Sequence, residues 1–286
     1  ALPGLLGKKT DKEKFAGAKD TYTIELMMPN GRAIQGPDFH DDGQNFAKAY
    51  NIKFLDRGKK EKYAYQSTYA ISTRMLGVMF AIHSDDKGLI LPPKLAENKI
   101  VIVPILFDES KKEVIREAEK LRKELQEFNP ILDSREEYSN GWKFNEWELK
   151  GIPLRIEIGP KDIEKKSVLA VKRTGEKLSI KIKELKKQIP KLLGEIQDEL
   201  YKRAENLLKS SIVKTENMNE LIDSIKNKKI VLTYLCNNSK CEDEIKARTA
   251  GAKTLNIPLK QPLLKGKKCI FCKNQAAYQI YIGKSY

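Results

Sequence analysis

The chain has 286 residues, 40% of them hydrophobic, which is enough for more than one folded core and speaks against global disorder. Lys and Arg number 54 against 39 acidic residues. The resulting net charge of +15 favours a polyanionic partner, most simply nucleic acid, over a lysine-rich surface that only aids solubility. The longest apolar runs are too short to span a membrane, and the N-terminus lacks the pattern of a signal peptide. We therefore expect a cytoplasmic protein with no membrane partner.

Residues 1–98 are expected to form one unit made largely of short strands and turns. The segment TYTIELMM, residues 21–28, alternates in the manner of a strand, and PNGR follows it as a turn. The segment FAKAYNIKF, residues 46–54, is expected to be short and buried. Residues 65–83 are apolar and helix-like, and the unit closes at LILPP, residues 89–93.

Residues 99–189 are expected to form a small α/β domain. KIVIVPILF opens it as a nearly all-apolar strand, which is typical of a sheet covered on both faces. A helix follows, capped by Asp108 or Ser110, with apolar residues at helical spacing. Further strands are expected in PLRIEIG, SVLAVKR and KLSIKIK. Strands interleaved with helices indicate the α/β class.

The last unit, residues 190–286, begins with an amphipathic helix from Pro190 to about Lys209, in which Pro190 occupies the first turn. It also carries every cysteine of the chain, in the segments CNNSKC and CIFC. Two close pairs of thiolates are the usual ligands of a tetrahedral structural Zn²⁺, and we favour this site over four free thiols or two disulfides. The predicted metal ligands are Cys236, Cys241, Cys269 and Cys272.

The segment GPDFHDDGQN, residues 36–45, gathers three acids, two amides and one of the two histidines, His40, into ten residues. We interpret it as a loop that is a working catalytic site, a metal site or a former active site. The metal site is the least favoured of the three, because no second histidine is spaced to join His40 and the aspartates.

The segment GWKFNEWELKGIPLRIEIGPKDIEKK, residues 141–166, resembles the anticodon-binding domain of prolyl-tRNA synthetases of the archaeal and eukaryotic type. The resemblance extends over essentially the whole chain. GKKTDKEKFAGAKDTYTIELMMPNGRAIQ and GQNFAKAYNIKF are similar to that family's catalytic domain after its second signature motif. STRMLGVMFAIHSDDKGLILPPKLA resembles its third motif, whereas the first and second motifs are not in this sequence.

The resemblance implies a multi-domain fold of the α/β and α+β classes. Residues 1–98 would form the C-terminal part of a class II catalytic domain, which is built on an antiparallel sheet. Residues 99–189 would form an α/β anticodon-binding domain. Residues 190–286 would form a linker helix and a small zinc-binding α+β domain.

The resemblance also implies roles for residues of the first domain. Arg74, in ISTR, matches the third-motif arginine, a catalytic residue that binds the phosphates of ATP together with Mg²⁺. An arginine suits this role because it is always charged and pairs with phosphate oxygens in a fork. The implied pocket for ATP and proline consists of Glu25, Gln35, His40, Gln44 and Arg74.

A second implied site reads the anticodon. Glu148, Arg155 and Lys161 match positions that contact the guanines of a proline anticodon. An arginine donates to guanine O6 and N7, and a carboxylate accepts from the ring N–H and the amino group of an unpaired base. The resemblance further implies that the C-terminal carboxylate of Tyr286 folds back toward the catalytic domain.

The first domain departs from the family's pattern at two places. Asp38 and Phe39 replace a Thr-Ser pair, and Tyr69-Ala70 replaces a Trp-Gly pair before the third motif. We expect the added charge and bulk to hinder binding of ATP and proline.

Two functional hypotheses follow. The first is a proline–tRNA ligase whose partners are tRNA(Pro), proline and ATP, with a second chain, or a homodimer of the full enzyme, supplying the first two motifs. The alternative is a catalytically degenerate paralogue that binds tRNA, another structured RNA or the ribosome.

Overall fold

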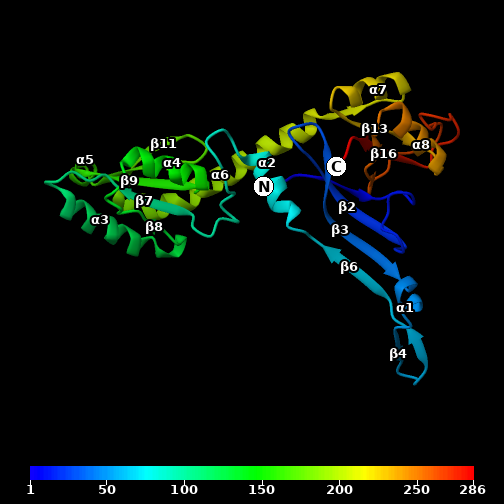
Figure 1. The fold of residues 1–286 in the computed structure, drawn as a ribbon, viewed down its shortest axis with the longest axis horizontal. Helices are drawn as coiled ribbons and strands as arrows, with labels where there is room; N and C mark the ends of the chain where they lie inside the picture. The colour runs from blue at the N-terminus through cyan, green and yellow to red at the C-terminus, as the bar shows by residue number, and fades with distance from the viewer. The chain divides into compact units, whose positions relative to one another are not determined.

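The computed structural model describes all 286 residues and divides the chain into two compact units. One unit consists of residues 79–204 together with Ala1, and the other of residues 2–78 and 205–286. Two helices, α2 (Arg74–His83) and α6 (Ile182–Ser210), run across the unit boundaries (Figure 1). None of the helices combines the length and apolar character needed to cross a membrane.

The unit of residues 79–204 is built on a five-stranded sheet with the order β11-β10-β9-β7-β8. The first three strands along the chain are parallel, and the last two are antiparallel to their neighbours. The strands are β7 (Ile100–Pro104), β8 (Ile131–Leu132), β9 (Leu154–Ile158), β10 (Ser167–Lys172) and β11 (Lys177–Lys181). The helices besides α6 are α3 (Lys111–Glu124), the 3₁₀ turn η1 (Gln126–Phe128), α4 (Asn140–Lys150) and α5 (Pro160–Glu164).

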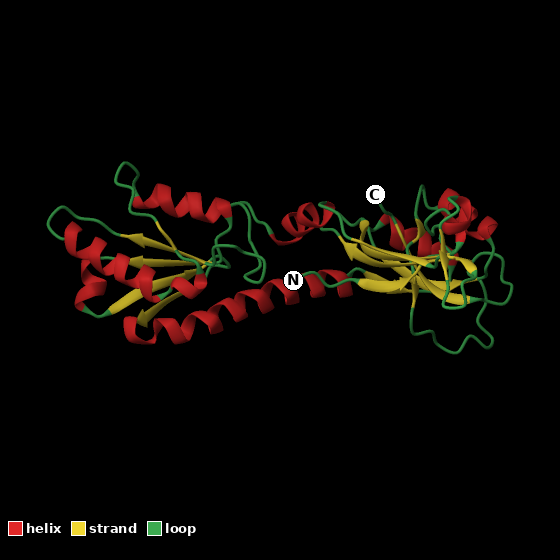
Figure 2. Cartoon of the chain, turned by 90° about the horizontal axis from the view of Figure 1, so that it is seen from below, coloured by secondary structure: helices red, strands yellow, loops and turns green.

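Helices cover both faces of this sheet, as the all-apolar strand at residue 100 predicted (Figure 2). On one face Ile100 and Ile102 pack with α3 and the first half of α6. On the other face Val101 and Val103 pack with Trp147 of α4. The predicted α/β class is therefore confirmed, because alternate residues of β7 enter two separate apolar layers.

Helix α6 corrects one prediction. It begins at Ile182, so Pro190 lies inside the helix and not in its first turn. The turns before the proline bury Leu185 and Ile189 in the core of the unit. This burial offsets the backbone hydrogen bond that a proline inside a helix removes.

The second unit contains an antiparallel sheet with the order β15-β1-β2-β3-β6. Its edge strand β15 comes from the C-terminal part of the chain, where Pro258 pairs with Gly7 of β1. The strands are β1 (Leu5–Lys8), β2 (Asp20–Met27), β3 (Ala33–Gly43), β6 (Gln66–Ala70) and β15 (Ile257–Pro258). The N-terminal and C-terminal parts of the chain thus share one sheet.

A second, four-stranded sheet in this unit has the order β12-β13-β16-β14. Its strands are β12 (Ile212–Lys214), β13 (Ile230–Leu235), β14 (Lys253–Thr254) and β16 (Tyr278–Gly283). Helices α7 (Met218–Lys226) and α8 (Ser239–Arg248) accompany it. The core of this region includes Ile280 and Ile282 of β16 and the buried Cys241 and Cys269.

The structure corrects three predictions for residues 36–83. Residues 36–43 are not a loop but continue strand β3, paired with β2 and β6. Residues 46–54 are largely exposed and form α1 (Asn45–Ala49) and β4 (Lys53–Leu55), which pairs with β5 (Glu61–Tyr63). Residues 65–83 combine strand β6 with helix α2, because apolar content by itself does not distinguish the two periodicities. The boundaries of the three predicted domains stay predictions.

Candidate functional site

A row of polar side chains lies on the antiparallel sheet of residues 2–78, across strands β2 and β3. Gln35 donates to Asp38 through its Nε2, at 2.8 Å, and His40 Nε2 lies 3.3 Å from Asp38 Oδ1. His40 Nδ1 in turn lies 3.0 Å from Thr21 Oγ1. Asp38 stands where the prolyl-tRNA synthetase pattern has a threonine. Its carboxylate lies between Gln35 and His40, two of the predicted pocket residues.

Glu25 sits in register opposite Gln35 and is almost completely buried. The ammonium of Lys9, also buried, lies 2.6 Å from its Oε1, and Thr23 donates to the same oxygen at 3.1 Å. A buried carboxylate needs such partners, because desolvation of an unpaired charge is costly. Glu25 is therefore held in the fold by an internal counter-ion.

The other predicted pocket residues are placed differently. Gln44 precedes α1 and donates to the Tyr63 carbonyl at 2.9 Å. Arg74, at the start of α2, is exposed and makes no hydrogen bond or ion pair. The ring of Phe39 packs at a tilt against Tyr69, with ring centroids 4.6 Å apart, whereas its neighbour His40 contacts Thr21 and Phe15. Phe39 thus packs between two aromatic rings, those of Tyr69 and Tyr22.

The predicted anticodon residues lie in the unit of residues 79–204, around helix α4. The helix is capped at its start by Ser139, whose Oγ accepts from the Trp142 N–H, and at its end by Gly151, whose φ is +76°. A Cβ on Gly151 would meet the Leu89 carbonyl oxygen at 2.7 Å, so a glycine is required there. This ending turns the chain directly into β9, which carries Arg155 beside Glu148.

Arg155 is the centre of this cluster. Its Nη1 lies 3.2 Å from Glu148 Oε1, its Nε donates to Glu157 at 2.9 Å, and its guanidinium lies 4.2 Å from the centroid of the Phe144 ring. Lys161, on α5, is exposed and makes no hydrogen bond or ion pair. The structure therefore brings Glu148 and Arg155 together, and leaves Lys161 unpaired.

Arg173 also belongs to the cluster around Arg155 and Glu148, and the sequence did not predict it as a site residue. Its Nε donates to the carbonyl of Glu148 at 3.0 Å, and its other nitrogens form a fork with both carboxylate oxygens of Asp85, at 2.9 and 2.6 Å. The hydrogen bonds from Arg173 lower the pKa of Asp85 to about 2. Arg173 thus fixes the backbone that carries Glu148, and its only sequence signal was a basic residue ending a strand.

The four cysteines gather in one cluster, and none is in a disulfide. All four sulfurs lie within 4.8 Å of one another, with Cys236 Sγ 3.5 Å from Cys241 Sγ and 3.6 Å from Cys272 Sγ. A tetrahedron with Zn–S bonds of about 2.3 Å has sulfur–sulfur edges of about 3.8 Å. The cluster therefore fits a four-coordinate metal ion and leaves no coordination position open.

Tyr286 lies beside the start of β3. Its N–H donates to the Ala33 carbonyl at 3.3 Å, and the guanidinium carbon of Arg32 lies 5.3 Å from the centroid of its ring. The last residue is thus docked on the antiparallel sheet. The orientation of its carboxylate toward a catalytic pocket stays a prediction.

Comparison with known proteins shows which domains and relatives the chain resembles. The family profile described as "Anticodon binding domain" matches residues 99–192, and the profile described as "Prolyl-tRNA synthetase, C-terminal" matches residues 218–286. The proline–tRNA ligase of Natranaerobius thermophilus is 40% identical over 291 residues, covering all of this chain and 60% of the relative. Proline–tRNA ligase 2 of Bacillus cereus is 40% identical over 292 residues, with the same coverage.

An α/β anticodon-binding domain joined to an antiparallel sheet defines part of an aminoacyl-tRNA synthetase. The two profiles and the matches to proline–tRNA ligases over the whole of this chain support a C-terminal portion of a prolyl-tRNA synthetase. It spans about 60% of the length of the curated relatives it matches. The archaeal and eukaryotic type stays a prediction, because the matched descriptions name no type.

Proposed function

We propose that this chain is the tRNA-recognising part of a proline–tRNA ligase, which couples proline to tRNA(Pro) with ATP. The observation that carries the proposal is the Glu148–Arg155 pair, held beside Phe144 in the domain matched to anticodon binding. A forked cation next to a carboxylate offers both the donors and the acceptor that the edges of guanine need.

In the structure these two side chains are paired, and each has a second partner, Glu157 for Arg155 and Lys87 for Glu148. Binding of a guanine would replace the 3.2 Å bond between Arg155 and Glu148 with one bond from each residue to the base. Glu157 keeps Arg155 oriented from its other side, at 2.9 Å. The exposed ammonium of Lys161 is free for a further contact with the anticodon loop.

The catalytic contribution of the chain would come from the antiparallel sheet. Arg74 is exposed and unpaired, so its guanidinium is available for the phosphates of ATP and its Mg²⁺. Glu25, Gln35, His40 and Gln44 would line the pocket for proline and adenylate. The first two signature motifs would be supplied by a second chain or within a homodimer of the full enzyme.

The cysteine cluster would hold a structural Zn²⁺. Cys241 and Cys269 are buried, and all four sulfurs face one another within a small core of α8 and β16. The ion would supply no chemistry. It would add a covalent link between the segment at the start of α8 and the segment around residue 270, which already share one apolar core.

The binding-only paralogue is kept as a second candidate because of Asp38. Its carboxylate accepts a hydrogen bond from Gln35 and lies 3.3 Å from His40 Nε2, so an added negative charge stands beside two groups proposed for substrate. Proline-dependent exchange of pyrophosphate into ATP separates the two functions. Exchange catalysed by this chain would exclude the degenerate paralogue, whereas tRNA binding without exchange by the chain joined to its first two motifs would exclude the ligase.

The anticodon assignment is tested by filter binding of tRNA(Pro) and of a transcript with one anticodon guanine replaced. Arg155→Lys keeps the charge but loses the fork, and should weaken binding of tRNA(Pro) by about 5- to 150-fold while abolishing discrimination between the two RNAs. Arg116→Lys, on the exposed face of α3, is the matched control. Unchanged discrimination in the Arg155 variant would overturn the assignment.

A further inference from the structure

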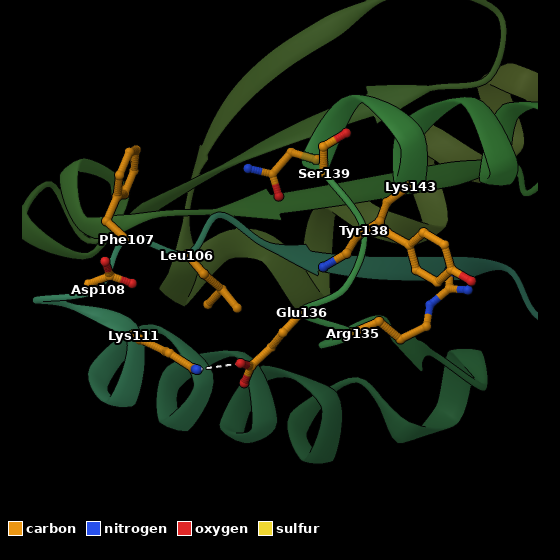
Figure 3. Close-up of a pocket in the computed structure, with 10 residues that line it drawn as sticks. Leu106, Phe107, Asp108, Lys111, Arg135, Glu136, Tyr138, Ser139 and Lys143 are labelled. Atoms are coloured by element: carbon orange, nitrogen blue, oxygen red, sulfur yellow. Dashed lines mark hydrogen bonds and ion pairs between the residues drawn. The ribbon is translucent and has the colours of Figure 1, made fainter.

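A polar cavity lies in the unit of residues 79–204, next to the first turn of α4 (Figure 3). It has a volume of about 250 Å³ and is lined by residues that follow β7, by α3 and by the segment that leads from β8 into α4. None of the proposed anticodon residues lines it. The cavity contains Lys143, Ser139, Asn140, Lys111, Glu136 and Asp108.

Lys143 is the unusual residue of this cavity. It is 1% exposed, and yet no carboxylate lies within ion-pair distance of its ammonium. Its only hydrogen bond is a 3.5 Å contact to the Asp133 carbonyl, so two of its three donors have no acceptor. The Asp133 carboxylate is engaged elsewhere, by Arg135 at 2.8 Å and by Trp147 at 2.8 Å.

A buried ammonium without a counter-ion is costly, because desolvation is not offset by an opposite charge. Figure 3 shows the Lys143 side chain leaving α4 with its nitrogen directed into the cavity. The cavity is therefore where a compensating negative charge would sit. Two carboxylates line the cavity, but neither forms an ion pair with Lys143, because Glu136 is paired with Lys111 and Asp108 is exposed to solvent.

The backbone of the first turn of α4 adds hydrogen-bond donors beside the cavity. Ser139 and Asn140, the cap and first residue of α4, line the cavity. The N–H groups of Asn140 and Gly141 have no acceptor, as expected for the first turn of a helix, and point back from the helix toward the preceding segment. An anion there would meet free N–H groups, the positive end of the helix dipole and the Lys143 ammonium.

We propose that this cavity binds a phosphate group, and specifically a backbone phosphodiester of the RNA that the neighbouring Glu148–Arg155 pair reads. Tyr138 and Trp142 flank the cavity, stacked on each other with ring centroids 3.9 Å apart and each partly exposed. Exposed aromatic rings beside a phosphate site are typical of single-stranded RNA recognition. This choice of phosphate source rests on the proposed function, whereas the anion site itself does not.

The anion site is tested first without RNA. Inorganic phosphate should shift the NMR amide signals of Asn140 and Gly141 saturably, and chloride at equal ionic strength should not. Lys143→Met keeps the length of the side chain and should abolish the response. Lys143→Arg should retain it, which separates loss of charge from loss of packing. Lys150→Met, on the same helix but exposed, is the matched control and should respond like the wild type.

A second variant, in which a negative charge is removed from the cavity, should change phosphate affinity in the opposite direction. Asp108 is the lining carboxylate that lacks an ion pair, so Asp108→Asn should tighten phosphate binding. Failure of phosphate to shift the two amides, or an equal response in the Lys143→Met protein, would overturn the anion site. A response that is confined to phosphate concentrations far above those in cells, and that Lys143→Met leaves in place, would mean an adventitious ion only and would overturn it equally.

The source of the phosphate is tested with tRNA(Pro). Lys143→Met should weaken binding about tenfold, to the same extent for the transcript with a replaced anticodon guanine, and should lower the salt slope by about 0.7 to 0.9. Retained tRNA affinity and salt slope in the variant, with phosphate binding lost, would assign the site to free phosphate and overturn the RNA proposal. Absence of tRNA binding by the wild type would refute the proposed function, while the amide shifts would still decide the anion site.

Discussion

The buried pair of Lys9 and Glu25 gives the sharpest test of how the antiparallel sheet is stabilised. The two charged atoms lie 2.6 Å apart, and the side chains are 6% and 1% exposed. At an effective dielectric constant of about 20, their attraction is about 6 kcal/mol. Most of this is offset by the cost of desolvating both ions, so the net contribution of the pair to stability is small.

Removing only one of Lys9 and Glu25 is expected to lower the free energy of unfolding much more than removing both. Lys9→Met leaves Glu25 with only Thr23 as a hydrogen-bond partner, and should lower the free energy of unfolding by about 3–5 kcal/mol. The double variant Lys9→Met/Glu25→Gln leaves no buried charge, and should recover most of that loss. The difference between the single and double variants measures the coupling between the two residues.

Urea unfolding provides the assay, with two probes that report on different units. Trp142 and Trp147 are the chain's two tryptophans, and both lie in the unit of residues 79–204, whereas the Lys9–Glu25 pair lies in the other. Lys9→Met should shift the far-UV circular dichroism transition of its own unit and leave the tryptophan fluorescence transition unchanged. A loss below about 1 kcal/mol, or a double variant as unstable as the single one, would refute the reasoning.

Two further predictions concern pH and metal. Burial lowers the pKa of His83 to about 4, so its unfolded form binds a proton at higher pH than its folded form. The stability of its unit, followed by tryptophan fluorescence, should therefore fall as the pH drops from about 6.5 to about 4, and His83→Leu should flatten this dependence. An equally steep pH dependence of stability in His83→Leu would contradict the assignment of this dependence to His83. For the metal, the purified chain should carry about one equivalent of Zn²⁺ by mass spectrometry, and a strong chelator should remove it and lower the melting temperature. Cys272→Ser should reduce the zinc content, whereas a metal-free wild type that is equally stable would exclude the site.

Much of the α/β unit could be predicted from the sequence, because its signals are local. The run of apolar residues around Ile102 indicated a strand covered on both faces, and the structure has that arrangement. The spacing of the two cysteine pairs likewise indicated one cluster, since each pair is close along the chain. The residues around Glu148 and Arg155 were identified by their resemblance to a family and not by periodicity.

Lys143 shows where local patterns fail. It belongs to the segment on which the resemblance rests, and it lies four residues before the buried Trp147, on the same face of α4. That spacing was a signal that the lysine points inward. Its burial and the lack of a counter-ion depend on Asp133, Arg135 and the end of β7, which the helix pattern does not contain.

The sequence by itself determined the class of the central domain, the clustering of the cysteines and the resemblance to prolyl-tRNA synthetases. Only the tertiary structure decided that residues 36–43 continue a strand, and that Pro258 pairs with Gly7 to complete the edge of the N-terminal sheet. The physical reason is that hydrophobic periodicity reports which face of an element is buried, whereas strand pairing joins segments far apart in the chain. The positions of buried charges such as Lys9, Glu25 and Lys143 are set by those same long-range contacts.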